Sequence, residues 1–214
     1  MEITHYGHSC VLLDSGSARL LIDPGAFSTG FEGVTGLDAV LITHQHADHL
    51  DPDRLPALLA ANPDARLIVD PGTATQLPDG IGREHEPVEP GDTLTVGGAR
   101  VEVLGGAHAV IHPDIPGITN NAYLVDGTHL HPGDSIDTFP PGELEVLFLP
   151  GAAPWSKVGE TIDYLRAVAP RTAVPIHEAI LAEPGIGVIR GLLDRLGPQA
   201  TTFRPLDAGV PTEL

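Results

Sequence analysis

The sequence predicts an α+β fold in which two groups of β-strands are each followed by a helix. Short apolar runs bounded by Gly, Pro, Asp and Ser are typical of strands. Leu55, Leu58 and Leu59 recur at helical spacing and predict a helix with one buried face. A length of 214 residues with 42% hydrophobic residues is enough for one substantial core. We therefore expect a single domain over residues 1–214.

The first group of strands precedes a helix that we expect over residues 51–61. Asp14-Ser15-Gly16-Ser17 is a turn sequence between two apolar runs and predicts a hairpin. Asp51-Pro52-Asp53 offers an N-cap, a proline at the first helical position and an acidic first turn. The expected strands of this group cover residues 3–6, 10–14, 19–23, 38–42 and 66–69.

The second group of strands begins near residue 93. Asp126-Gly127 lies between two apolar runs and is a strong signal for a tight hairpin. Amphipathic spacing predicts helices over residues 157–168 and 185–196. The expected strands cover residues 93–96, 100–104, 122–126, 128–131, 145–149 and 172–175.

The charge balance excludes several kinds of partner. Eleven Lys and Arg face 29 Asp and Glu, for a formal net charge of −18. A nucleic-acid binder needs cations to displace the counterions of phosphates, and an anionic membrane also attracts cations. The chain has no long apolar run and no basic segment before one. We therefore expect a cytoplasmic protein with a small-molecule substrate, and neither a nucleic acid nor a membrane as partner.

The most informative stretch is His44-Gln45-His46-Ala47-Asp48-His49, which follows the apolar run 37–42. Three imidazoles and one carboxylate within six residues would repel one another on protonation and resist burial. Zn²⁺, Mn²⁺ and Fe²⁺ accept these side chains as ligands, so a metal site explains the cluster well. The expected strand before it and helix after it place the cluster on a loop at the end of a strand.

Three further polar residues, His108, Asp134 and His177, each follow an expected strand. Glycines beside His108 and Asp134 would let the backbone approach a metal without crowding from side chains. Any one of these histidines alone is more often a structural residue than a ligand. Together with the cluster, in this order, they indicate metal binding.

These residues resemble the pattern of the metallo-β-lactamase superfamily, an H-x-H-x-D-H loop followed by a His, an Asp and a final His. The resemblance runs through most of the chain. Tyr6-Gly7-His8-Ser9-Cys10 is similar to the opening of the branch that holds the ascorbate-6-phosphate lactonases and many uncharacterised metal-dependent hydrolases. The resemblance implies a four-layer αββα sandwich with a dinuclear metal site at one edge.

The resemblance also implies a role for each of the matching residues. His44, His46 and His108 would bind one metal, Asp48, His49 and His177 the other, and Asp134 would bridge both. The expected cofactor is two divalent ions, zinc first and manganese or ferrous iron as alternatives. They would hold a water or hydroxide between them as the nucleophile, and Asp48 could accept or donate its proton.

Four other residues are candidates for the pocket. His112 lies four residues past His108, where it could donate a proton or merely cap a loop, and His131 lies on the strand that leads to Asp134. We count Asp48, His112 and His131 as the catalytic candidates. His129 shares a face with His131 and is expected to be a solvated strand residue. His8, on a turn between strands, could support the metal site or lie on the surface.

Three further residues have two interpretations each. Asp23 could orient a ligand imidazole or form a turn before Pro24. Trp155 could form an apolar wall for the substrate or anchor the helix that follows it. Lys157, the only lysine, could meet an anionic group, although an exposed position in the first helical turn is the safer interpretation.

The function that we expect is hydrolysis of a small-molecule ester, lactone or phosphate ester by a metal-activated hydroxide. Scattered arginines argue against a phosphate-bearing substrate and favour a neutral ester or lactone. The first alternative is a nuclease-type phosphodiesterase of the same superfamily, against which the net charge counts. The second is a non-hydrolytic di-iron redox or metal-sensing protein, because the same ligands accept iron.

Overall fold

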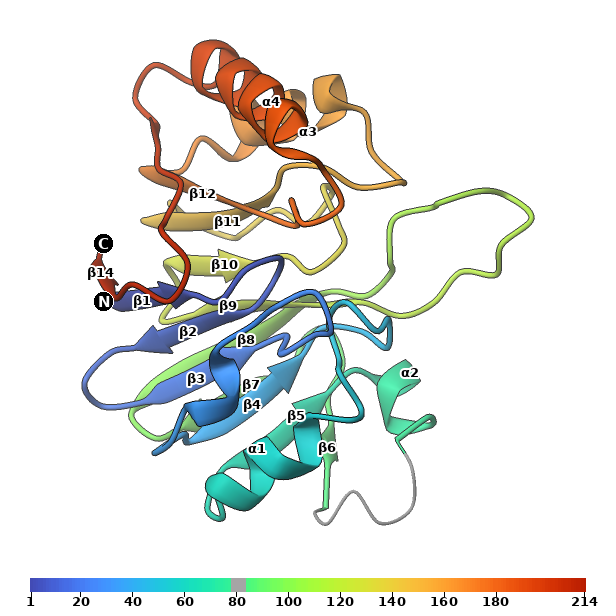
Figure 1. Ribbon diagram of the computed structural model, residues 1–214, viewed down its shortest axis with the longest axis vertical. Coiled ribbons are helices and arrows are strands. Elements are labelled where there is room, and N and C mark those ends of the chain that lie inside the picture. Colours follow the sequence, from blue (N-terminus) through green and yellow to red (C-terminus); the bar gives the residue numbers. More distant parts are fainter. Residues whose placement is uncertain (78–83) are drawn as a thin grey trace.

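The computed structural model describes residues 1–77 and 84–214, in which two β-sheets pack face to face between helices (Figure 1). The layers follow the order helix, sheet, sheet, helix, so the αββα sandwich that the resemblance implied is confirmed. No helix in the described ranges has both the length and the apolar character needed to cross a bilayer.

The first sheet is built mainly from the N-terminal part of the chain and has the strand order β14-β1-β2-β3-β4-β5-β6. β1, β2 and β3 pair antiparallel, whereas β3, β4, β5 and β6 run parallel. Its strands are β1 (Glu2–His5), β2 (Val11–Asp14), β3 (Arg19–Ile22), β4 (Ala39–Ile42), β5 (Arg66–Val69), β6 (Glu86–Pro87) and β14 (Thr212–Glu213).

The second sheet has the order β13-β12-β11-β10-β9-β8-β7, with antiparallel pairs from β7 to β10 and parallel pairs from β10 to β13. The expected hairpin at Asp126-Gly127 is present, and both residues have a positive φ, 50° and 69°. The strands are β7 (Thr93–Val96), β8 (Ala99–Gly105), β9 (Asn121–Val125), β10 (His129–His131), β11 (Val146–Pro150), β12 (Thr172–Ile176) and β13 (Thr202–Phe203).

The helices cover the outer faces of the sheets. α1 (Leu55–Ala61) packs Leu55, Leu58 and Leu59 on the first sheet, while α3 (Val158–Val168) and α4 (Glu183–Leu196) cover the second. Two short helical elements, η1 (Phe31–Gly33) and α2 (Pro71–Ala74), were not expected. The expected helix over 51–61 begins only at Leu55, because the Asp51 carboxylate accepts hydrogen bonds from the backbone of Asp53 and Arg54 in a preceding turn.

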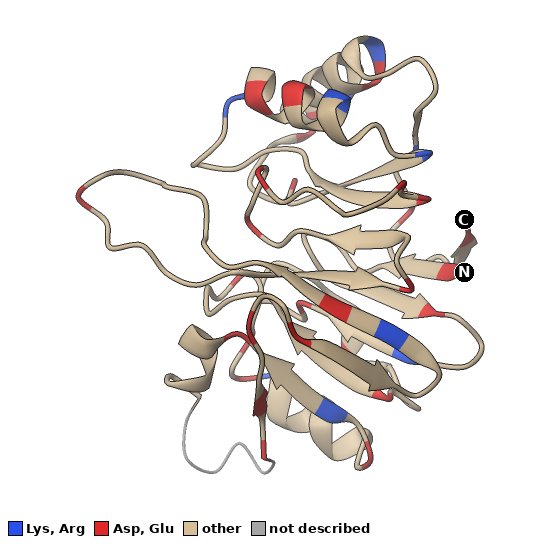
Figure 2. Cartoon of the chain, turned by 180° about the vertical axis from the view of Figure 1, so that it is seen from behind, with Lys and Arg blue, Asp and Glu red and all other residues tan. Residues whose placement is uncertain are grey.

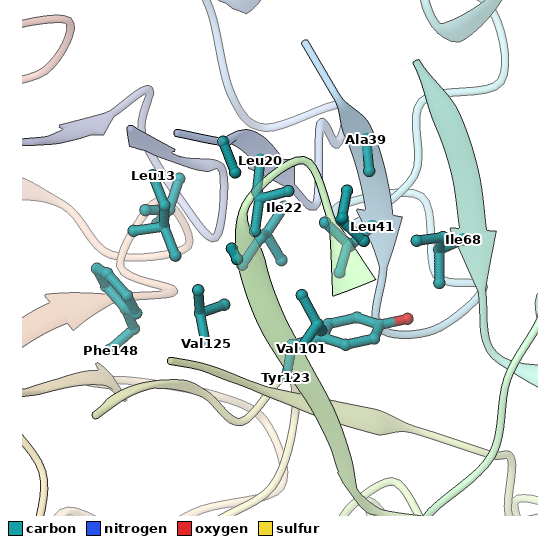
Figure 3. Packing of buried hydrophobic residues seen from close by; sticks show 14 of the residues in the cluster. Leu13, Leu20, Ile22, Ala39, Leu41, Ile68, Val101, Tyr123, Val125 and Phe148 are labelled. Carbon is teal, nitrogen blue, oxygen red and sulfur yellow. The ribbon is translucent and has the colours of Figure 1, made fainter. Parts of the chain in front are cut away.

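The central core lies between the two sheets and is almost entirely aliphatic (Figure 3). Leu13, Leu41 and Phe148 are among its fully buried side chains. Tyr123 spans the interface, and its hydroxyl donates to the carbonyl of Ile42 in the opposite sheet at 2.8 Å. Burial of these surfaces, at roughly 25 cal/mol per Å², fixes how the sheets are stacked and hence how their strand ends meet.

His129 differs from its expected place in solvent. Its exposed fraction is only 6%, because β10 lies inside the second sheet between β9 and β11. The Nδ1 atom of His129 lies 3.0 Å from the hydroxyl of Thr128. The alternation of side chains along a strand assigns residues to a face, but it does not say whether that face is covered.

Candidate metal centre

The predicted ligands converge at one edge of the sandwich, where strand ends of both sheets meet. His44, His46, Asp48 and His49 lie on the loop after β4 of the first sheet. The remaining three come from the second sheet: His108 follows β8, Asp134 follows β10, and His177 follows β12. The fold therefore brings together side chains that are as many as 133 residues apart (177 − 44) in the sequence.

Among the described residues, these side chains form two groups whose ligand atoms lie within 4.8 Å of one another. The first group consists of His44, His46, His108 and Asp134. The second group consists of His8, Asp48, His49 and His177. The first group contains the three histidines that the resemblance assigned to one metal, together with Asp134, and the second contains the three residues assigned to the other metal, together with His8.

Asp134 stands between the two groups, with one carboxylate oxygen directed to each. Its Oδ2 lies 3.2 Å from Nε2 of His108 and 3.9 Å from Nε2 of His44. Its Oδ1 lies 3.0 Å from Nε2 of His49 and 3.3 Å from Nε2 of His177. A carboxylate in this position could serve as a ligand to two cations at once.

Three of the histidines are held by a hydrogen bond at Nδ1 and direct Nε2 into the site. Nδ1–H of His108 donates to the carbonyl of Ala109 at 2.6 Å, and Nδ1–H of His177 donates to the carbonyl of Ala152 at 2.7 Å. Nδ1–H of His49 donates to the carboxylate of Asp23 at 2.7 Å. Each of these bonds makes Nδ1–H the donor, so Nε2 is the nitrogen that a metal ion would take as its ligand.

Asp23 thus takes the orienting role that was one of its two interpretations. Its second contact, a hydrogen bond accepted from the hydroxyl of Thr43 at 2.7 Å, fixes the carboxylate in turn. Thr43 Oγ1 also lies 3.1 Å from Nδ1 of His44. One buried carboxylate and one hydroxyl therefore orient a ligand from each group.

Several inward-facing ligand atoms are buried without a hydrogen-bond partner, and a bound cation would supply one. Nε2 of His49, Nε2 of His177 and Oδ1 of Asp134 are buried and make no hydrogen bond of acceptable geometry, although Oδ1 lies within 3.3 Å of both nitrogens. Unpaired buried polar atoms are costly, so three converging at one point require an explanation. Nitrogen and carboxylate donors are the ligand set of Zn²⁺ and similar ions, and the residues present fit two such ions.

The pKa shifts reflect the same crowding. Burial, followed by the proximity of His49, holds the pKa of His44 well below its usual range. Burial opposes ionisation of Asp48 and Asp134, but the surrounding histidines hold the pKa of both carboxylates below the usual range. Burial also lowers the pKa of His177, yet the carboxylates of Asp134 and Asp48 outweigh it and raise that pKa to about 9.

His8 and Trp155 support the carboxylates. Nε2–H of His8 donates to Oδ2 of Asp48 at 3.0 Å, and the His8 backbone carbonyl accepts from the backbone N–H of His177 at 2.9 Å. The indole N–H of Trp155 donates to Oδ2 of Asp134 at 2.9 Å, so neither interpretation made of Trp155 from sequence included its main contact. The sequence signal for His8 was its place in the turn before β2, whereas nothing in the sequence pointed to the partner of Trp155.

The other candidates lie at differing distances from the site. His112 is exposed and lines a pocket beside His46 and His108, and Lys157 is exposed and pairs with Glu160 at 3.0 Å. His131 is fully buried away from the two groups: its Nε2–H donates to the carbonyl of Ser9 and its ring contacts Phe148. This placement favours a structural role for His131 over the catalytic one expected from sequence.

The backbone around the ligands is held in uncommon conformations. His8, Asp23 and His177 all have a positive φ, at 46°, 51° and 63°, which non-glycine residues seldom adopt. Such strain persists only where the surrounding structure holds it, and it gathers at functional sites.

An αββα sandwich with histidine and carboxylate ligands at one edge defines a class of metal-binding proteins. Residues 2–177 match the family model of the β-lactamase superfamily domain, and the chain belongs to that family. Protein Rv0786c of Mycobacterium tuberculosis is 54% identical over 202 residues, which are 92% of each chain. The UPF0173 protein PF0020 of Pyrococcus furiosus is 29% identical over 194 residues, 86% of each chain. A crystal structure described as a metal-dependent hydrolase of Parabacteroides distasonis superposes with a TM-score of 0.74 and 23% identity, over 96% of this chain and 92% of that one.

Proposed function

We propose that this protein is a metal-dependent hydrolase that holds two divalent ions and cleaves an uncharged small-molecule ester or lactone. The observation that carries the proposal is Asp134, whose two oxygens face two separate groups of inward-pointing histidine nitrogens. The membership of the β-lactamase superfamily and the structural likeness to a protein described as a metal-dependent hydrolase support it.

When bound, two divalent cations supply Lewis acidity, which lowers the pKa of a water molecule and polarises a carbonyl or phosphoryl oxygen. The residues of the chain supply the rest. Asp48 is ionised, because His8 and His177 hold its pKa low against the effect of burial. Its carboxylate is partly exposed, and so it can accept a proton from an attacking water or orient that water.

His112 is placed to meet the departing group. Its side chain is exposed on the loop beside His46 and His108, and its ring lies 3.6 Å from the carboxylate of Asp114. An imidazole there can donate a proton to an alkoxide as the carbonyl–oxygen bond breaks. We assign this step to His112 and none to His131.

The cationic side chains favour an uncharged substrate over a phosphate ester or a nucleic acid. Most are already paired with carboxylates, and none lines the pocket beside the ligands among the described residues. The pairs are Arg19–Asp14, Arg54–Asp51, Arg66–Glu86, Arg100–Glu102, Lys157–Glu160, Arg166–Asp163, Arg171–Glu145 and Arg190–Glu178. Among the residues of 1–77 and 84–214, none offers a phosphate group in this pocket an arginine clamp of the kind that such recognition uses.

The test combines metal analysis with a substrate screen. Elemental mass spectrometry on the purified protein should find close to two transition-metal ions per chain, with zinc as the expected element. The loaded protein should hydrolyse carboxylic esters or lactones in preference to phosphodiesters. Asp134→Asn should neither hold the two metal ions nor hydrolyse these substrates. Persistent absence of metal after zinc or manganese is added would overturn the proposal. Iron alone, without any hydrolysis, would favour the di-iron alternative, and hydrolysis of phosphodiesters alone would favour the nuclease-type alternative.

A further inference from the structure

A pocket of about 270 Å³ adjoins the first group of ligands. His46 and His108 form its floor, and its walls come from the loop between β8 and β9, which extends from the body of the protein (Figure 1). The volume lies near the lower end of the range for small-molecule sites, and it therefore suits a group of a few carbons rather than a large ligand.

The walls are apolar although the loop faces solvent. Val110, Ile111, Ile115 and Ile118 line the pocket, together with two prolines. Val110 and Ile115 have exposed fractions of 72% and 51%. Large aliphatic side chains gathered on an exposed loop mark a binding surface more often than chance, because their exposure to water is unfavourable.

The polar residues of the pocket are histidines alone. Apart from His46, His108 and His112, the described lining contains no charged or hydroxyl-bearing side chain. The loop from Ala109 to Asn120 has no Lys or Arg and one acidic residue, Asp114, and Figure 2 shows this projecting loop in tan apart from a red segment at its far end. Along these walls a carboxylate or phosphate would lose its hydration without gaining a Lys or Arg partner from the described lining.

The loop is tied to the metal ligands at its base. The backbone N–H of His108 donates to the carbonyl of Ile118 at 3.1 Å, and that of Ala109 donates to the carbonyl of Asp134 at 2.9 Å. The ring of His108 also donates to the carbonyl of Ala109. The apolar walls therefore have a fixed position relative to two predicted ligands, so a group bound there would be held beside the ions.

We propose that this pocket binds the uncharged aliphatic acyl chain of the substrate and places its carbonyl over the first group of ligands. The proposal rests on the proposed hydrolase function and adds a substrate class to it: short to medium acyl esters or lactones without an anionic group. Val110 and Ile115 are the residues that set this preference.

Binding of hydroxamic acids tests the pocket without catalysis, because the hydroxamate group ligates a metal while its alkyl chain explores the walls. The probes are aceto-, butyro- and hexanohydroxamic acid, with succinic monohydroxamic acid as the charged analogue. Titration calorimetry on zinc-loaded protein should show the Kd falling about fourfold for each added methylene. The succinic analogue should bind no better than the acetyl one.

Ile115→Asp is the variant that tests the wall, and Val188→Asp is its matched control. Ile115 is half exposed, so the substitution leaves the core intact, and Val188 lies exposed on α4, outside the pocket. Ile115→Asp should abolish the dependence on chain length, whereas Val188→Asp should behave as wild type. Equal affinities across the series in wild type, a preference for the succinic analogue, or no binding of hexanohydroxamate would overturn the proposal.

Hydrolysis of p-nitrophenyl acetate, butyrate and hexanoate separates this proposal from the proposed function. Hydrolysis of all three with a flat dependence of kcat/KM on chain length would uphold the hydrolase and reject the acyl pocket. Chain-length-dependent hydroxamate binding without hydrolysis of any ester or lactone would uphold the pocket and reject the hydrolase.

Discussion

The indole N–H of Trp155 donates a 2.9 Å hydrogen bond to Oδ2 of Asp134, the oxygen that faces His44 and His108. This bond orients the carboxylate that both groups share. Trp155→Phe removes the donor and keeps most of the ring. We expect metal binding to weaken about 10- to 100-fold, as is typical when a group that orients a ligand is lost. Competition with a chromophoric chelator measures this, and Phe139→Leu, at an exposed aromatic residue, is the control.

Asp134→Ala should reduce the bound metal to less than one ion per chain and abolish hydrolysis, because it removes the carboxylate whose two oxygens face the two groups. Elemental mass spectrometry gives the stoichiometry. His129→Gln is the control, since His129 is also buried but lies outside both groups. Full metal content in Asp134→Ala would contradict the bridging role, and metal loss in His129→Gln would point to a global effect.

His8→Ala should weaken the binding of one metal ion and leave the binding of the other unchanged. His8 contacts Asp48 of the second group and none of the first, so its loss should lower affinity at the second site. A chelator titration that resolves two steps should show the weaker step shifted about 10- to 100-fold and the other unchanged. His85→Ala, outside both groups, should shift neither. Equal shifts of both steps would count against this local role.

Gly25→Ala should disrupt the loop that carries the ligands. A Cβ at Gly25 would lie 1.8 Å from the backbone oxygen of Asp48, so this loop must move to admit it. We expect loss of metal and a lower Tm, of the order of several degrees. Gly33→Ala is the matched control, since its Cβ would meet no atom within 4 Å. Wild-type metal content in Gly25→Ala would show that the loop adapts freely.

The metal-free protein should be most stable near pH 6.5, the ordinary pKa of histidine. The pKa of His177 rises to about 9 on folding, where nearby carboxylates outweigh burial, so its contribution is present below pH 6.5 and is lost as the pH rises to 9. Burial lowers the pKa of His8 to about 4, so stability also falls as the pH drops from 6.5 towards 4.

Tm values from pH 4 to 10 measure both limbs. Bound zinc should suppress the loss of Tm between pH 6.5 and 9, because a histidine that ligates a metal is neutral already. His8→Gln should reduce the loss of Tm between pH 6.5 and 4. A Tm of the metal-free protein that climbs steadily from pH 6.5 to 9 would contradict the assignment for His177.

Much of the fold follows from the sequence because its signals are local. The hairpin at Asp126-Gly127 and the apolar face of α1 depend on residues a few positions apart. The short helix α2 also had a local signal that went unused: Asp70 caps it and Pro71 opens it. Burial of His129 had no such signal, because it depends on which strands flank β10.

The site divides in the same way. The dense cluster His44–His49 and the ordered polar residues after strands located the predicted ligands. The contacts that orient them come from distant residues: Asp23 reaches His49, and Trp155 reaches Asp134. Neither partner lies near its ligand in the sequence, and each pair meets only because neighbouring strands of one sheet, β3 with β4 and β10 with β11, bring their ends together. His131 shows the converse, since its sequence position beside Asp134 did not place its ring in the site.

The division of the ligands between the two sheets has a consequence for how the protein acquires its ions. A chain made from its N-terminus offers His44, His46, Asp48 and His49 early, while Asp134 and His177 emerge long after. Neither group is complete until the second sheet docks on the first. Because the site does not exist in the unfolded chain, the free energy of metal binding contributes to the free energy of folding. Metal ions should therefore bind late during biosynthesis, after the two sheets have docked, and stabilise their association.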